Sequence, residues 1–185
     1  LGAWLLRIRV HTKGLEQTPK SGRFLLVCNH LSILDPALLL IYFKKSQLAF
    51  ISKQENKSMF LVGKVMHKLL CQLINRENDR EALKTIINCI HIVQEDKASI
   101  GVFPEGYIHG DNLLHTFRSG VFKIAQKANV PIVVCTLQNT QNILRVDVTG
   151  TGSIVGCGDG HMNVLVQQGV AVGSLNFGDD ILIIF

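Results

Sequence analysis

Short apolar runs alternate with segments of helical periodicity along most of this chain, and this alternation restricts the fold more than any other feature. The apolar runs are Phe24–Cys28, Leu48–Ser52, Leu73–Ile74, Ser99–Phe103 and Pro131–Thr136, and helices are predicted over 37–43, 57–70, 79–93 and 119–128. Strands that alternate with helices form a sheet covered by helices. We therefore predict an α/β fold with a mixed central sheet flanked by helices.

Capping residues and apolar stripes define the predicted helices. Ser32 and Asp79 are expected to cap the first and third of them. In the third helix, the residues at core-facing spacing are Leu83, Ile86, Ile87, Ile90 and Val93. In the second, they are Met59, Phe60, Val62, Val65, Met66 and Leu69. We interpret the second stripe mainly as core, with an acyl-chain groove as the alternative because Met side chains adapt to flexible ligands.

Polar side chains follow several of the apolar runs directly. His30, Arg76 and Glu105 are all expected to emerge beyond the carboxyl ends of strands, where ligands collect in α/β sheets. His30 has a side chain suited to proton transfer near neutral pH. Asp35, five residues later, can orient the imidazole and leave its other nitrogen as a base. A structural histidine with satisfied hydrogen bonds is the alternative interpretation.

Four short motifs appear in a fixed order. They are Asn29-His30-x4-Asp35, Ile74-Asn75-Arg76, Phe103-Pro104-Glu105-Gly106 and Val130-Pro131-Ile132-Val133-Val134. Together they resemble the motifs of the glycerolipid acyltransferase family, whose type member makes phosphatidic acid. The resemblance implies a glycerolipid-acyltransferase-like fold, with His30 as general base, Asp35 as its orienting acid and Asn29 in the substrate-binding motif.

The resemblance also implies how the acceptor is held. Glu105 and Gly106 would hold its glycerol and Arg76 its phosphate, for which a guanidinium fork is well suited. A turn carboxylate and a solvated arginine are the alternatives for Glu105 and Arg76. Many family members carry an arginine two residues after the third motif, but this chain has Tyr107-Ile108-His109 there. Candidate replacements are Arg118 and Lys123, with His109 and His115 as weaker ones.

The implied reaction moves a fatty acyl group from acyl-CoA or acyl-carrier protein to 1-acylglycerol-3-phosphate, giving phosphatidic acid. A thioester is already activated, so we expect neither a metal, nor a cofactor, nor a covalent intermediate. No nucleophile elbow is present, and strand alternation predicts that Cys28 points away from the site or into the core. The alternatives are an acyltransferase for another lysophospholipid and a non-catalytic lipid-binding module of the same fold.

Charge and composition indicate the partners. The net charge of +5 and pI near 9.0 suit anionic partners such as phospholipid headgroups or a phosphorylated substrate. No nucleic-acid recognition motif is present, so nucleic acid is not an expected partner. We expect association with the cytoplasmic face of a membrane. The five cysteines lack Cys-x-x-Cys spacing, which favours neither zinc nor a disulfide framework.

Three segments are expected along the chain. Residues 1–22 form an amino-terminal arm, in which Leu1 to Arg7 is either the end of a membrane-anchoring helix or an ordinary first helix. Residues 23–145 form the acyltransferase domain. Residues 146–185 form a glycine-rich tail in which 164–166, 170–172 and 181–185 are predicted strands. The tail lacks the G-x-G-x-x-G arrangement of dinucleotide sites.

Overall fold

A single sheet organises the computed structural model, which describes residues 9–55, 60–109, 113, 115–141 and 161–168. Its strands are β1 (Arg9–Lys13), β2 (Leu25–Cys28), β3 (Leu48–Lys53), β4 (Gln72–Ile74), β5 (Ser99–Val102), β6 (Ile132–Gln138) and β7 (His161–Gln168). The helices are η1 (Leu15–Gln17), α2 (Asp35–Tyr42), α3 (Phe60–Lys68), α4 (Asp79–Gln94), η3 (Ser119–Phe122) and α5 (Lys123–Ala128). Strands and helices alternate from β2 to β6, as the sequence predicts.

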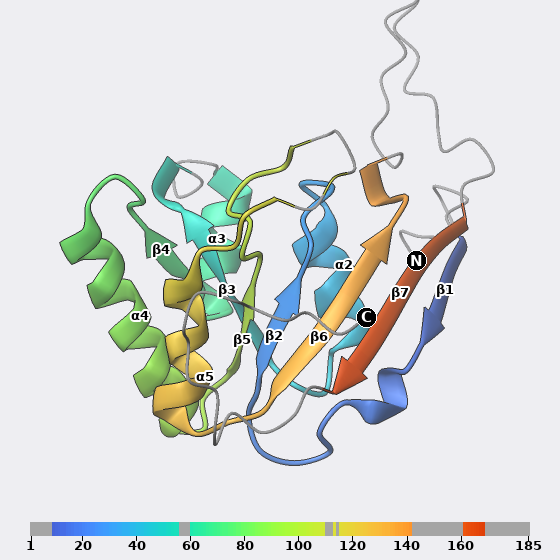
Figure 1. Ribbon diagram of the computed structural model, residues 1–185, viewed down its shortest axis with the longest axis horizontal. Coiled ribbons are helices and arrows are strands. Elements are labelled where there is room, and N and C mark those ends of the chain that lie inside the picture. Colours follow the sequence, from blue (N-terminus) through green and yellow to red (C-terminus); the bar gives the residue numbers. More distant parts are fainter. Residues whose placement is uncertain (1–8, 56–59, 110–112, 114, 142–160, 169–185) are drawn as a thin grey trace, which may run out of the picture.

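The sheet is mixed, which confirms the predicted fold class. Its strand order is β1-β7-β6-β2-β5-β3-β4 (Figure 1). The strands from β2 to β6 are parallel to one another, whereas β7 runs antiparallel to β6 and parallel to β1. The predicted strand at 164–166 is confirmed as part of β7, and those at 170–172 and 181–185 lie outside the described residues. One edge of the sheet is therefore built by segments from near both ends of the chain.

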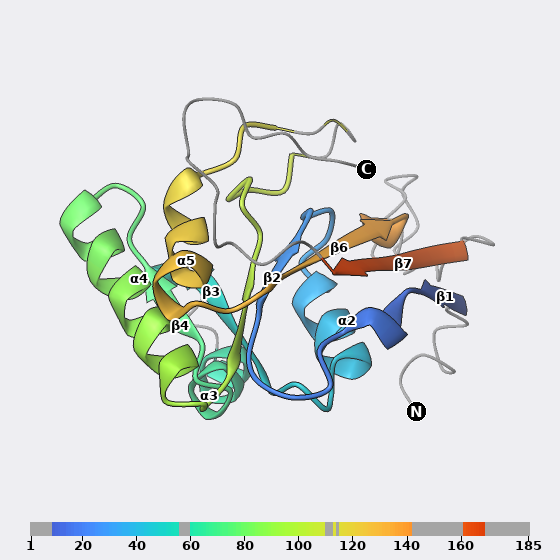
Figure 2. The same cartoon turned by 60° about the horizontal axis from the view of Figure 1, so that its bottom comes forward.

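Helices cover both faces of the sheet at β2, so this strand is buried on two sides. Phe24, Leu26 and Cys28 of the β2 region pack with α2 on one face. Leu25 and Val27 alternate to the other face, where they pack with α4 and α5. Figure 2 shows α2 and the α4–α5 pair on opposite sides of the strands. This continuous burial explains why β2 is an unbroken apolar run rather than an alternating one.

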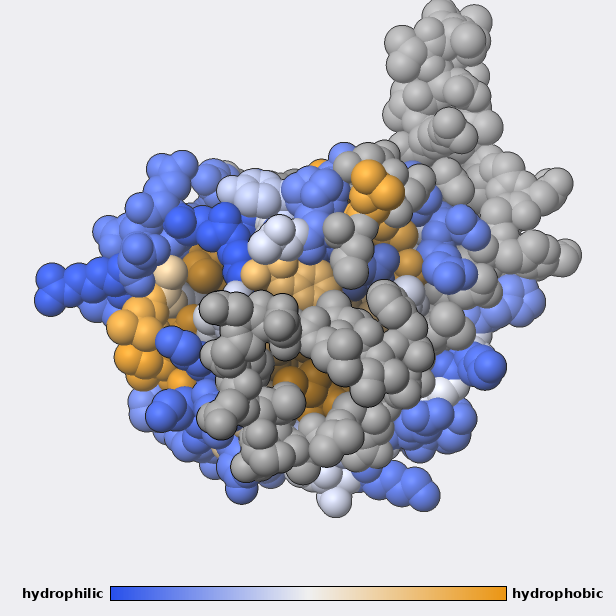
Figure 3. All heavy atoms as spheres, in the orientation of Figure 1, coloured by the Kyte–Doolittle hydropathy of each residue, from blue (hydrophilic) through white to orange (hydrophobic). Residues whose placement is uncertain are grey.

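The buried face of α4 differs from the predicted stripe. Ile86 and Val93 are buried as expected, but Leu83 and Ile87 are 54% and 43% exposed, so the prediction is wrong for these two. Thr85 and Cys89 complete the buried face instead. The Thr85 hydroxyl donates to the carbonyl of Leu73 in β4 at 2.8 Å, which turns this side of α4 toward the sheet. Figure 3 shows an apolar surface in the region of α4, and this pair are the exposed large apolar residues of that helix.

Two predicted helix caps are also wrong. The cap of α4 is Asn78, whose side-chain oxygen accepts from the backbone N–H groups of Arg80 and Glu81 at 3.1 and 3.2 Å. Asp79 is instead the first residue of the helix. The cap position of α2 is Leu34, and Ser32 lies two residues earlier. The Ser32 hydroxyl accepts from the Leu34 N–H at 3.3 Å, so it stabilises the loop that contains His30.

The helix predicted over 57–70 ends two residues earlier in the structure, at Lys68. Its predicted start is not tested, because residues 57–59 lie outside the described residues. Val65 is 48% exposed, so its assignment to the core is wrong, whereas Met66 and Leu69 are half-buried. Neither the burial of the other stripe residues nor the acyl-groove alternative is tested. Within the described ranges, no helix has the length and apolar character needed to cross a membrane.

Candidate active site

Three predicted site residues follow parallel strands, just beyond the carboxyl ends of those strands. His30 comes two residues after β2, Arg76 two residues after β4, and Glu105 three residues after β5. The sheet has β2, β5, β3 and β4 as consecutive neighbours that run in the same direction. These residues therefore emerge at the same end of the sheet, beyond the carboxyl ends of the strands. The predicted convergence at the carboxyl ends of the strands is therefore confirmed.

His30 and Asp35 are in direct contact. His30 Nδ1 lies 2.9 Å from Asp35 Oδ2. The same carboxylate oxygen accepts from the backbone N–H groups of Leu31 and Ser32 at 2.7 and 2.8 Å. The Asp35 side chain is fully buried, whereas that of His30 is 18% exposed. With its proton on Nδ1, the imidazole donates to the carboxylate, and Nε2 keeps a lone pair available for a substrate proton.

An aromatic stack fixes the plane of the imidazole. The His30 ring stacks on Phe103 with centroids 4.0 Å apart and an angle of 18° between the planes. Phe103 in turn lies parallel to Phe50 of β3, at 5.9 Å. A Cβ at Gly101 would lie 2.4 Å from the Phe50 ring, so only glycine leaves room for this ring. The apolar run before the third motif therefore helps to position the histidine of the first.

Asn29 connects two strands. Its side-chain oxygen accepts from the Leu137 N–H at 2.8 Å, and its Nδ2 donates to the Leu137 carbonyl at 3.0 Å. These bonds extend the pairing between β2 and β6 by one residue and hold the backbone just before His30. They support a positioning role, and the predicted contact of Asn29 with substrate stays a prediction.

The third motif forms a tight turn that connects the histidine to a group of cations. The Gly106 N–H donates to the Phe103 carbonyl at 3.0 Å, which closes a β-turn and keeps the ends of the motif within about 7 Å. Glu105 is buried, and one of its carboxylate oxygens accepts from the backbone N–H of His115 at 3.3 Å. Gly106 has φ +80°, a conformation that strains residues with a Cβ. The Arg118 N–H donates to the Pro104 carbonyl at 2.9 Å and thereby fixes Arg118 beside the turn.

Three cationic side chains gather next to Gly106, and we call Lys53, Arg76 and Arg118 the cationic cluster. A Cβ at Gly106 would lie 3.2 Å from Arg118 Nε and 3.8 Å from Arg76 Cζ, so both guanidinium groups border the glycine. The Tyr107 ring centroid lies 4.5 Å from Lys53 Nζ, 4.8 Å from Arg76 Cζ and 5.9 Å from Arg118 Cζ. Within the described part of the chain, Arg76 Nη1 is buried without a hydrogen-bond partner. A buried donor of this kind is costly unless a ligand accepts from it.

The remaining candidates for the phosphate lie in different positions. Lys123 is exposed in the first turn of α5, and no contact links it to the cationic cluster within the described residues. The rings of His109 and His115 stack on each other with centroids 3.6 Å apart. The role of each in binding phosphate stays a prediction. Sequence reasoning missed Lys53 and Tyr107, since their proximity depends on β3 lying between β5 and β4.

The thiol next to the motif is a poor nucleophile. Cys28 is buried in the core, which is one of its two predicted orientations, and lies opposite Cys135 on β6. Burial and the neighbouring Cys135 thiol raise the pKa of Cys28 well above its usual value. Little thiolate therefore forms near neutral pH, which disfavours an acyl-enzyme at this position.

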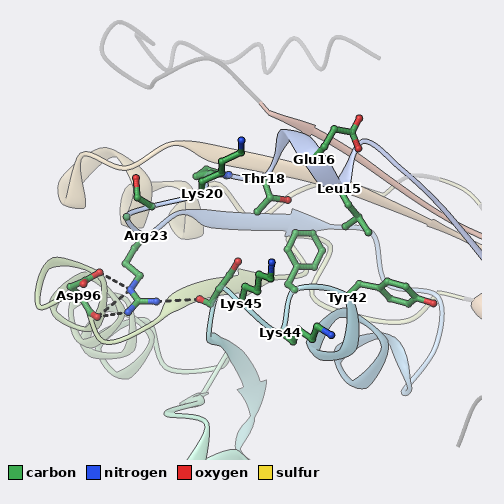
Figure 4. Close-up of a pocket in the computed structure, with 14 residues that line it drawn as sticks. Leu15, Glu16, Thr18, Lys20, Arg23, Tyr42, Lys44, Lys45 and Asp96 are labelled. Carbon is green, nitrogen blue, oxygen red and sulfur yellow. Dashed lines mark hydrogen bonds and ion pairs between the residues drawn. The ribbon is translucent and has the colours of Figure 1, made fainter. Parts of the chain in front are cut away.

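A separate cavity lies at the opposite end of the strands, before the amino end of β2 (Figure 4). It has a volume of about 610 Å³, and residues 15–23 and 42–46 form most of its lining. The Arg23 guanidinium is held there by the Asp96 carboxylate, at 2.7 Å from Nε, and by the Ser46 carbonyl. None of the predicted site residues lines this cavity, so it is not part of the site around His30.

Comparisons with known proteins show which family the chain resembles. The family model described as Acyltransferase matches residues 8–138. The 1-acyl-sn-glycerol-3-phosphate acyltransferase of Borreliella burgdorferi is 29% identical over 142 residues, which are 77% of this chain and 56% of that protein. The probable 1-acyl-sn-glycerol-3-phosphate acyltransferase of Mycoplasma pneumoniae is 36% identical over 126 residues, 66% of this chain and 46% of that protein. The chain thus spans about half the length of these relatives.

A solved structure shares the fold. It is the crystal structure of the 1-acyl-sn-glycerophosphate (LPA) acyltransferase, PlsC, from Thermotoga maritima, which matches with a TM-score of 0.75 and 23% identity. The match covers 92% of this chain and 65% of that one. The family model spans the four motifs that suggested the family, from before Asn29 to beyond Val134. The chain therefore belongs to the acyltransferase family.

Proposed function

We propose that this chain catalyses acyl transfer from acyl-CoA or acyl-carrier protein to the free hydroxyl of 1-acylglycerol-3-phosphate, giving phosphatidic acid. The observation that carries the proposal is the His30–Asp35 pair, joined by one β-turn to the cationic cluster. A base and an anion-binding group at this separation suit an acceptor that carries a hydroxyl and a phosphate on neighbouring carbons. The names of the relatives support the same acceptor.

The proposed reaction has one tetrahedral intermediate and no acyl-enzyme. His30 Nε2 takes the proton of the acceptor hydroxyl as its oxygen attacks the thioester carbonyl. The intermediate then expels the thiolate, which takes the proton back from the imidazolium, so that protons balance over the cycle. The buried Asp35 carboxylate stabilises the imidazolium while it exists. A base of this kind contributes roughly 10²–10⁴-fold to the rate.

The cationic cluster supplies the selectivity for phosphate. A phosphate monoester carries close to two negative charges at neutral pH. Arginine binds it through paired N–H donors, and Arg76 Nη1 is a buried donor without a partner in the described residues. Arg118 takes the place of the arginine that many family members carry two residues after the third motif. Lysophospholipids with a diester headgroup offer one charge less to this cluster, so we expect them to be weaker acceptors.

The proposal includes attachment to a membrane surface near the site. Ile33, Ile108 and Leu113 are 62%, 45% and 69% exposed. They lie in the loops that follow β2 and β5, beyond the same carboxyl ends of the strands as His30. Apolar side chains at the same end of the strands as a cationic cluster suit the interface of an anionic bilayer, where a lysophospholipid acceptor is found. Binding through such a patch alone would be reversible.

An acceptor panel tests the proposal. Labelled acyl-CoA and acyl-carrier protein are offered with 1-acylglycerol-3-phosphate, with its phosphocholine diester and with monoacylglycerol. We expect the fastest transfer to the phosphate monoester, and loss of that preference in Arg76→Ala. Arg80→Ala removes an exposed arginine in the first turn of α4 and is the matched control. Equal rates with all three acceptors in the parent protein would contradict the proposed acceptor.

A further inference from the structure

Tyr107 occupies an unusual position among the three cations. It directly follows Gly106, and its ring lies within 4.5 to 5.9 Å of a charged group of each member of the cationic cluster. Like charges at this spacing repel one another when no anion is bound. Among the described residues, no carboxylate forms an ion pair with Lys53, Arg76 or Arg118. The Tyr107 ring, near which all three cations lie, can hold the cluster together.

An aromatic ring can do this without competing with the ligand. A cation within about 6 Å of a ring centroid is attracted by the negative face of the ring. This attraction leaves the N–H groups of the cation free, whereas a carboxylate would accept from them and neutralise part of the charge. Arg76 fits this description, because its guanidinium lies over the ring while its buried Nη1 has no partner in the described residues.

We propose that Tyr107 is a positioning residue for the acceptor phosphate. Its ring gathers Lys53, Arg76 and Arg118 into one anion-binding group and keeps their donors available. The inference rests on the proposed function, since it assigns the cluster to the phosphate of the acceptor. It predicts that the ring, and not the hydroxyl, is what the site needs.

Steady-state kinetics with 1-acylglycerol-3-phosphate test this role. Tyr107→Leu removes the ring, and we expect KM for the acceptor to rise about 5- to 30-fold, with kcat changed much less. Tyr107→Phe keeps the ring and should have the parental KM. Tyr42→Leu makes the same change at the other tyrosine of the chain and should also keep the parental KM. Tyr42 lines the cavity at the opposite, amino end of the strands. A parental KM in Tyr107→Leu, or a fall in kcat at unchanged KM, would overturn the inference.

Direct binding separates this inference from the proposed reaction. Glycerol 3-phosphate is titrated into the same variants by calorimetry, which requires no turnover. We expect the parent and Tyr107→Phe to bind it with similar affinity, and Tyr107→Leu to bind it more weakly. If the parent binds it in this pattern but transfers no acyl group to the lysophospholipid, the proposed function fails and the role of Tyr107 stands. If the parent does not bind it, or if Tyr107→Leu binds it as tightly as the parent, the role of Tyr107 fails.

Discussion

Replacing Asp35 by asparagine isolates the charge that the proposed mechanism needs. Asp35 Oδ2 faces His30 Nδ1 and two backbone N–H groups, so the amide oxygen of an asparagine is directed to the same place. The loop and the tautomer of His30 are then kept, and the negative charge alone is lost. In the parent, the unit charges that form during the reaction are separated by about the 2.9 Å between Nδ1 and Oδ2. Such a pair interacts by about 2–4 kcal/mol at an effective dielectric constant near 20, after allowance for the partly exposed ring.

That energy corresponds to a fall in kcat of about 30- to 1,000-fold. The assay is acyl transfer at saturating donor and acceptor, together with the thermal midpoint as a check that Asp35→Asn is folded. Asp96→Asn is the matched control, because it removes an exposed carboxylate at the opposite, amino end of the strands. A folded Asp35→Asn protein with kcat within about threefold of the parent would refute the proposed stabilisation of the imidazolium.

Further predictions concern the core, a helix cap and the thiols. Gly101→Ala places a Cβ 2.4 Å from the Phe50 ring. We therefore expect the free energy of unfolding to fall by about 1–3 kcal/mol and kcat to fall as well. A parental midpoint of urea unfolding would argue against this packing. Asn78→Ala should cost about 1 kcal/mol in the same urea assay, more than Asp79→Ala, and the reverse order would show that the cap is misassigned. Burial raises the pKa of Cys89 to about 12, so iodoacetamide at pH 8 should label it only after unfolding; rapid labelling of the native protein, read by peptide mass spectrometry, would contradict its burial.

Local features of the site could be predicted from the sequence. His30 and Asp35 are five residues apart in one loop, so their contact depends on a single turn and on the strand that precedes it. The same holds for the turn that ends at Gly106, where the positive φ matches a residue without a Cβ. The alternation of apolar runs with helical stripes likewise predicts a sheet covered by helices, of which β2 to β6 form the parallel part.

Features that depend on the order of the strands could not be predicted in this way. Lys53 and Tyr107 lie far apart in the sequence, and they meet because β3 is inserted between β5 and β4. No local pattern distinguishes that order from others. The predicted buried face of α4 was partly wrong for a related reason. Periodicity shows that the helix has an apolar side, but the hydrogen bond from Thr85 to Leu73 helps to determine which side faces the sheet.

The most direct test of the account compares acyl transfer by His30→Ala with that of the parent protein. Transfer from labelled acyl-CoA to 1-acylglycerol-3-phosphate is measured at saturating acceptor, with His91→Ala, at a histidine in the last turn of α4, as the control. The account predicts a loss of kcat of about 10²–10⁴-fold in His30→Ala and an unchanged kcat in the control. Equal rates in His30→Ala and the parent would contradict the assignment of His30 as the base.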